Sequence, residues 1–342
     1  MVIFEGNLNQ MKRETIEINE HLRTICWNDG KLVDWASAGI TFSINGKEGQ
    51  LGKYHYGFSD SVTTSADGIY ALIYDKLGTK GLLLKNGDLL REVNRSYYCA
   101  SVYEYPAAFA VVDNITYLIH CPFEYCRLEF ENVETGEIVT NIKGREPKDR
   151  FHSRLEISPC GTFLMSKGWW WHPLDIVEIF NIKECLANPL LLDEAKIYPD
   201  GSVEVCTASF IDKTRVLLGT SDEVLDDENM PVPVEHIAIW DIVSNELSGQ
   251  VKVQAEFGNL FVINENFAWD MYKYPKIINI KTGEITEQDE TINSGEQKSS
   301  IIGNSGKLPK IAFNNQTKQM AILVDKTIHI LIPSDKIMQP AN

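Results

Sequence analysis

The heptapeptide NVETGEI at residues 132–138 recurs as NIKTGEI at residues 279–285, and DIVSNEL at residues 241–247 follows the same pattern. NIKECL at residues 181–186 is a weaker copy. Each copy follows a short alternating apolar run, such as HIAIW at residues 236–240. The Thr-Gly or Ser-Asn pair supplies turn chemistry, because Gly and Asn tolerate a positive φ. Each copy therefore predicts a strand, a tight turn and a returning strand.

A second pattern precedes the first along the chain. SADGIYAL at residues 65–72 parallels SPCGTFLM at residues 158–165, and weaker forms occupy residues 210–217 and 313–320. Each places turn residues between two apolar strands and so predicts a second kind of hairpin. Joined end to end, the two hairpins make a unit of four strands.

The four-stranded unit repeats at a period of about 40 to 45 residues, which is typical of a β-propeller. We predict an all-β protein with one propeller domain over residues 1–342 and about seven blades. Six or eight blades remain open if the first unit is not a true blade. The last unit lacks a good fourth strand, so an N-terminal strand at residues 13–19 is expected to close the ring and protect its edges. The expected blades span residues 20–55, 57–95, 97–143, 151–190, 202–251, 253–288 and 299–333.

Three segments carry a family resemblance. IWDI at residues 239–242 resembles the Trp-Asp ending of a WD repeat, and the SADG and SPCG turns resemble hairpins of WD-repeat and TolB-like propellers. SKGWWWHP at residues 166–173 looks like a signature of uncharacterised bacterial propellers, a likeness that brings no activity with it. The Gly-His pair typical of a WD repeat is absent, so that family's buried His–Asp network is not expected. The resemblance implies an interaction platform, although some propellers of this superfamily are enzymes.

Composition narrows the classes of partner. The formal net charge is −16 over 342 residues, which disfavours nucleic acid and anionic membranes as partners. No signal peptide or membrane-spanning run is present in the sequence, so we expect a cytoplasmic protein, and we expect a monomer. The seven scattered cysteines predict free thiols. His120, Cys121 and Cys126 are too few for a structural zinc site, and no cofactor or metal is expected.

Aromatic residues gather in the loops between the second and third strands of the predicted blades, which share one rim, here called the top face. Trp and Tyr dominate interface hot spots, so exposed rings here would form a binding surface. The alternative is that these rings fold inward and pack between blades, since consecutive strand residues point to opposite faces. The candidate partner-binding residues are Trp35, Phe123, Trp169, Trp170, Trp171, His172, Trp269 and Tyr272.

The innermost strands are expected to line a central channel. The basic candidates alternate along the start of the fourth blade, which predicts that they share one face and could hold an anion. The alternative is that they form ion pairs with acids of neighbouring blades. The acidic candidates would hold a divalent cation in a lactonase-like site if they converged. The candidate channel-mouth residues are Arg150, His152, Arg154, Glu204, Glu256 and Asp60.

Catalytic motifs are weak. The sequence has no nucleophile elbow, phosphate loop or His-Glu-x-x-His motif, so no catalytic residue is assigned. The preferred hypothesis is a non-enzymatic protein–protein interaction module that binds an unknown protein through the top face. The alternative is a small-ligand-binding or hydrolytic, metal-assisted propeller with its site at the channel mouth. The polar stretch at residues 287–310 is expected to contain a mobile loop.

Overall fold

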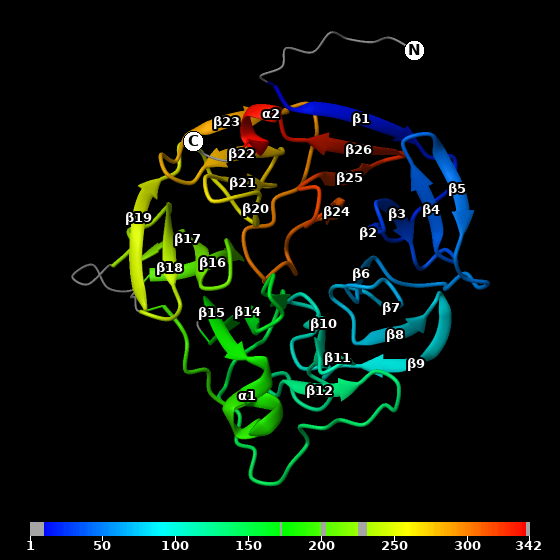
Figure 1. Ribbon diagram of the computed structural model, residues 1–342, viewed down its shortest axis with the longest axis vertical. Coiled ribbons are helices and arrows are strands. Elements are labelled where there is room, and N and C mark those ends of the chain that lie inside the picture. The colour runs from blue at the N-terminus through cyan, green and yellow to red at the C-terminus, as the bar shows by residue number, and fades with distance from the viewer. Residues whose placement is uncertain (1–9, 172, 200–202, 225–230, 340–342) are drawn as a thin grey trace.

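Seven small antiparallel sheets surround a common axis in the computed structural model, which describes residues 10–171, 173–199, 203–224 and 231–339 (Figure 1). Each sheet is one blade, and the prediction of an all-β propeller of about seven blades is confirmed. Five blades have four strands in the described residues. In blades 3 and 4 single bridges, Glu131 to Ile138 and Ile179 to Ile197, stand where the fourth strand would run.

The first three blades follow one another along the chain. Blade 1 comprises β2 (Cys26–Asn28), β3 (Lys31–Asp34), β4 (Ile40–Ser43) and β5 (Gly46–Gln50). Blade 2 comprises β6 (Ser61–Thr64), β7 (Tyr70–Tyr74), β8 (Lys80–Lys85) and β9 (Asp88–Asn94). Blade 3 comprises β10 (Ala107–Val112), β11 (Ile115–His120) and β12 (Glu129–Asn132).

The remaining four blades complete the ring. Blade 4 comprises β13 (Glu156–Ile157), β14 (Phe163–Trp170) and β15 (Leu174–Asn181). Blade 5 comprises β16 (Val203–Phe210), β17 (Arg215–Val224), β18 (His236–Asp241) and β19 (Glu246–Lys252). Blade 6 comprises β20 (Leu260–Val262), β21 (Phe267–Asp270), β22 (Lys276–Asn279) and β23 (Ile285–Gln288). Blade 7 comprises β24 (Lys310–Phe313), β25 (Met320–Val324), β26 (Thr327–Ile332) and the N-terminal strand β1 (Lys12–Glu17).

Helical structure is confined to short segments in the described residues. After blade 4 come α1 (Ile182–Ala187) and the 3-10 helix η1 (Pro189–Leu192), and α2 (Asp335–Met338) ends the described chain. In the part of the chain that the structure describes, no helix has the length and apolar character needed to cross a bilayer.

The ring is closed by strands from the two ends of the chain. β1 pairs antiparallel with β26, from Lys12 opposite Ile332 to Glu17 opposite Thr327. Ile16 of β1 is buried among the side chains that join blades 7 and 1. The predicted N-terminal closing strand is therefore confirmed, and it covers the outer edge of blade 7 that would otherwise expose unpaired backbone groups.

The recurring heptapeptide works as a turn because of its first residue. The side-chain Oδ1 of Asn132 accepts hydrogen bonds from the backbone N–H groups of the residues two and three places further on. Asp241 and Asn279 make the same pair of bonds in blades 5 and 6. The next turn residue takes the left-handed conformation, with φ of 74° at Gly136 and 60° at Asn245. The repeat is thus a local hydrogen-bonded turn, as its composition predicts.

A second recurring residue was missed at the level of sequence. An aspartate lies at the end of the second strand, or directly after it, in three blades: Asp34, Asp75 and Asp270. Each accepts a hydrogen bond from a backbone N–H group in the segment just before the first strand of the same blade. Asp34 receives the N–H groups of Arg23 and Thr24 in this way. In this chain, which lacks the Gly-His pair, these aspartates share backbone N–H groups as partners, and Asp270 also pairs with Lys276.

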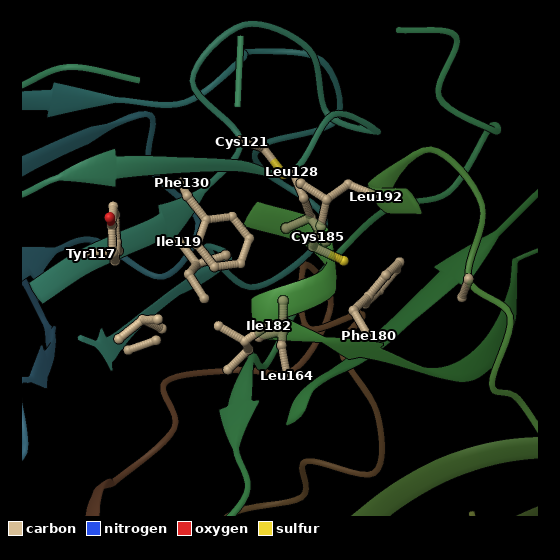
Figure 2. Packing of buried hydrophobic residues seen from close by; sticks show 13 residues of the cluster. Tyr117, Ile119, Cys121, Leu128, Phe130, Leu164, Phe180, Ile182, Cys185 and Leu192 are labelled. Atoms are coloured by element: carbon tan, nitrogen blue, oxygen red, sulfur yellow. The ribbon is translucent and has the colours of Figure 1, made fainter. Parts of the chain in front are cut away.

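The hydrophobic core lies mainly between neighbouring blades. Figure 2 shows the cluster between blades 3 and 4, where Phe130 of β12 meets Leu164 of β14 and Phe180 of β15. Ile182 and Cys185 of α1 pack into the same cluster. Because each blade uses both faces to contact its neighbours, large side chains on either side of a strand become buried.

The connection from blade 6 to blade 7, residues 289–309, crosses the ring and is here named the crossing segment (Figure 1). Ile301 bridges Tyr103 of the loop before blade 3, and Ser300 accepts a backbone hydrogen bond from Glu104 at 3.0 Å. The Ser300 hydroxyl donates to Asp175 of blade 4 at 3.2 Å, and Ser300 is fully buried. Within the stretch predicted to contain a mobile loop, Ser300 and Ile301 are thus held by contacts with blades on the far side of the ring.

Candidate functional site

Four of the eight predicted partner-binding residues lie inside the protein. Trp35 packs between blades 1 and 2, and Trp269 packs between blades 6 and 7 with its Nε1 donating to the Lys318 carbonyl at 2.8 Å. Trp169 and Tyr272 are also buried. The expectation that these four residues lie on the surface is wrong. Trp35 and Trp269 follow the inward-packing alternative, because the gaps between blades take large rings, whereas Trp169 stacks on Phe151.

Exposed aromatic side chains remain at the rim of blades 3 and 4. Trp171 is 45% exposed and Trp170 is 39% exposed, and Phe123 is exposed in the loop after β11. Two further residues were not among the predicted contacts: Tyr97 is 85% exposed and Tyr98 is 43% exposed. The remaining candidate, His172, lies outside the described residues.

The exposed rings stand on a buried base. Phe151 and Trp169 stack with their centroids 3.8 Å apart and their planes 4° apart. Trp171 stands edge-on to both, with centroids 5.4 Å from Phe151 and 5.7 Å from Trp169. Tyr125 stacks on Phe151 at 4.3 Å, and Tyr98 contacts both Tyr125 and Trp171. We name Tyr98, Tyr125 and Trp171 the aromatic patch; its rings hold one another in place, as offset and edge-on aromatic pairs do.

Backbone contacts fix this base. Phe151 and Trp169 exchange two hydrogen bonds, of 2.8 Å and 3.0 Å, as an isolated bridge. The close approach depends on Gly168, because a Cβ atom there would lie 2.0 Å from the Phe151 carbonyl oxygen. On its other side the base contacts Tyr103, and Ile301 of the crossing segment packs against it. The base of the aromatic patch is thus in contact with the crossing segment.

Arginines flank the patch. The Arg150 guanidinium lies over the Trp170 ring, 4.3 Å from its centroid, and its Nε is 3.5 Å from a carboxylate oxygen of Glu178. The Arg127 guanidinium lies 5.6 Å from the centroid of Phe123. Cation–π contacts of this kind hold exposed rings in preferred orientations.

The three basic residues predicted to share one face of a strand separate in the structure. Arg150 lies at the rim, His152 is buried, and Arg154 reaches into the channel. The expected alternation is wrong here because β13 begins only at Glu156 and Arg154 has a φ of 42°, which turns the chain. A single cationic cluster is therefore not formed by these three side chains.

The acidic candidates also have separate partners. Glu204 accepts hydrogen bonds from the Asp175 N–H at 2.8 Å and the Ser221 hydroxyl at 2.5 Å. Glu256 is exposed and pairs with two lysines, and Asp60 accepts from the Lys76 N–H. The three carboxylates thus do not converge as a lactonase-like site requires. Within the described ranges, no group of three or more His, Cys, Asp or Glu side chains is arranged to hold a metal ion.

His152 gives the protein a pH-dependent stability. Its Nδ1 lies 3.0 Å from the Ser166 hydroxyl, and burial lowers its pKa to about 3. Between pH 6.5 and 3 the unfolded chain binds a proton at His152, whereas the folded chain does not. The contribution of neutral His152 to the stability of the folded state is therefore complete above pH 6.5 and is lost as the pH falls. By pH 5 the loss from this group is about 2 kcal/mol.

Urea denaturation at pH 7.5 and pH 5 tests this contribution. His152→Gln should lose about 2 kcal/mol less than the wild type between the two pH values, because it has no imidazole to protonate on unfolding. His21→Gln, at an exposed position, is the matched control for removing an imidazole. An equal pH dependence in wild type and His152→Gln would contradict the assignment.

Comparison with known proteins supports the fold. No family model matches the sequence, and no curated protein sequence matches it. A chain of the solved structure titled "Crystal Structure of Mitotic Checkpoint Complex" is similar, with a TM-score of 0.59 and 9% sequence identity over 98% of this chain and 95% of that chain. That chain is a WD40 β-propeller. At this level of identity the likeness shows the propeller fold alone.

Proposed function

We propose that this protein is a non-enzymatic protein-interaction module that binds its partner through the aromatic patch and the exposed rings beside it, Tyr97, Phe123 and Trp170. The observation that carries the proposal is the contiguous set of aromatic contacts at the rim of blades 3 and 4. Water-exposed rings that are already held in position lose little side-chain entropy when a partner covers them. WD40-like propellers commonly serve as protein-interaction scaffolds.

We propose that the partner is a protein, and not a nucleic acid or an anionic membrane. The net charge of −16 opposes association with either. We propose that the module acts as a cytoplasmic monomer, so that the rim of blades 3 and 4 is free to take a different protein.

Affinity capture from a lysate of the source cells tests the proposal. The wild type should retain a specific protein that a Tyr98→Ala/Trp171→Ala double variant recovers at least about 30-fold less, the effect of losing a hot spot of about 2 kcal/mol. A Tyr54→Ala/Tyr198→Ala double variant is the matched control, since both rings are exposed elsewhere on the protein.

Each bait is first checked for folding by its thermal unfolding temperature. Recovery of the same protein by the wild type and the control, with loss from the Tyr98/Trp171 variant, supports the patch as the binding surface. Equal recovery by all three baits, or no specific protein with any of them, contradicts it.

A further inference from the structure

A cavity of about 460 Å³ occupies the centre of the ring. It is lined by the innermost strand of every blade, from Trp27 of β2 to Phe313 of β24. At one end it meets the crossing segment, which contributes Ser294 and Gln297. A space of this size is in the range that small metabolites occupy in proteins.

Arg154 is the cation that distinguishes this cavity. Its guanidinium donates to Asn259 Oδ1 at 2.6 Å, to the Cys206 carbonyl at 2.7 Å and to the Lys167 carbonyl at 3.4 Å. All three acceptors are uncharged, and among the described residues no carboxylate lies within ion-pair distance of Arg154. A guanidinium carries five N–H donors in a rigid fork, so two are left for a further acceptor.

The other cations in the cavity are compensated. Lys167 lies 2.6 Å from a carboxylate oxygen of Glu156, and Lys76 lies 3.4 Å from Glu104. These two pairs are neutral together. Arg154 makes no direct ion pair: burial raises the pKa of Asp175 to about 7, and the charge of Arg154 opposes that rise from a distance. A guanidinium that has no direct carboxylate partner and lines a confined polar space attracts a small anion.

The position of Arg154 is maintained by the fold. Its φ of 42° is a conformation that non-glycine residues rarely adopt. Its hydrogen bonds join blade 4 to Cys206 of blade 5 and to Asn259 at the start of blade 6. Backbone strain of this kind persists only where the surroundings hold the residue, and it collects at ligand sites.

We propose that the central channel binds a small oxyanion, a carboxylate or a phosphate, through the two remaining N–H groups of Arg154. The N–H groups of a guanidinium are charged donors, and they form strong hydrogen bonds with either a carboxylate or a phosphate oxygen. Gln297 and Ser294 of the crossing segment line the same cavity, but their donors are occupied: the Gln297 amide donates to Glu104, and the Ser294 hydroxyl donates to the Met271 carbonyl. Arg154 is therefore the donor that the proposal rests on. The site is separate from the aromatic patch and does not depend on the proposed protein partner.

Thermal unfolding in a chloride buffer, titrated with sodium citrate or with inorganic phosphate, tests the site. A ligand that binds only the folded state raises the unfolding temperature in a saturable way. We expect this rise with at least one of the two anions, beyond that caused by sodium chloride at equal ionic strength. A response to citrate alone assigns a carboxylate ligand, and a response to phosphate alone assigns a phosphate ligand.

Asn259→Asp separates loss of binding from loss of folding. The aspartate keeps an oxygen acceptor for Arg154 and places a carboxylate in direct contact with the guanidinium. The variant should therefore unfold no earlier than the wild type, while its anion affinity falls about tenfold or more. Asn45→Asp makes the same charge change at an exposed position and should keep the wild-type response. Absence of a saturable rise in the wild type, or an unchanged affinity in Asn259→Asp, would overturn the proposal.

Discussion

Gly168→Ala is expected to destabilise the protein by about 3 to 5 kcal/mol, because an added methyl group would overlap a neighbouring backbone and not a movable side chain. The new Cβ would lie 2.0 Å from the Phe151 carbonyl oxygen and 3.2 Å from the His152 Cα. The chain can relieve this overlap only by separating Phe151 from Trp169, which breaks both hydrogen bonds of their bridge. Urea denaturation measures the loss, and near-ultraviolet circular dichroism should report the disturbed aromatic rings.

Gly49→Ala is the matched control for this prediction. Gly49 lies in the exposed strand β5, and a Cβ there meets only the Thr41 hydroxyl at an ordinary 3.5 Å. Its expected effect is within about 0.5 kcal/mol, as for most surface substitutions. Similar losses in the free energy of unfolding for the two variants would contradict the prediction that the close contact between Gly168 and Phe151 is important for stability.

Asp270→Asn is expected to destabilise the protein by about 3 to 5 kcal/mol, because it leaves a buried ammonium group without its counterion. Lys276 Nζ lies 2.7 Å from Asp270 Oδ2, and both side chains are almost completely buried. The Oδ1 atom of Asp270 also accepts the N–H groups of Gly258 and Tyr272. An asparagine keeps these acceptor contacts, so the measured change in the free energy of unfolding reports mainly the lost charge.

A double-mutant cycle isolates the pair. Adding Lys276→Met to Asp270→Asn removes the stranded charge, so the double variant should recover a large part of the lost stability. Glu256→Gln breaks an exposed ion pair with Lys273 and serves as the control, with an expected loss within about 1 kcal/mol. Additive effects at Asp270 and Lys276 would contradict a direct interaction between them.

Prediction from the sequence succeeded where the information is local. The turn at residues 132–138 is held by hydrogen bonds from Asn132 to amides two and three residues away, so its composition suffices to identify it. The closing strand is predicted because the last repeat lacks a fourth strand and residues 13–19 form an alternating run that can supply it.

Prediction failed where a residue's surroundings come from another blade. Trp170 and Trp169 are adjacent and chemically identical, yet one is exposed and the other is stacked on Phe151. Alternation along β14 predicts that neighbours differ but not which of them faces inward. The prediction that Arg150, His152 and Arg154 form a cluster assumed alternating strand residues. The positive φ of Arg154 turns the chain, so the three side chains do not share one face. The crossing segment has a polar composition, and Ser300 is buried only because Asp175 and Glu104 meet it across the ring.

Local sequence patterns are enough to predict the architecture: hairpins that repeat at a regular period, a ring of about seven blades and a terminal strand that closes it. These follow from turn chemistry and strand periodicity, which act between residues close together in the chain. Three features depend on tertiary contacts: which rings reach the surface, that Arg154 lines the channel without a direct carboxylate partner, and that residues of the crossing segment line the same channel. These features depend on contacts between blades that lie far apart in the sequence. A local sequence pattern does not identify which distant residue will pack against a given side chain.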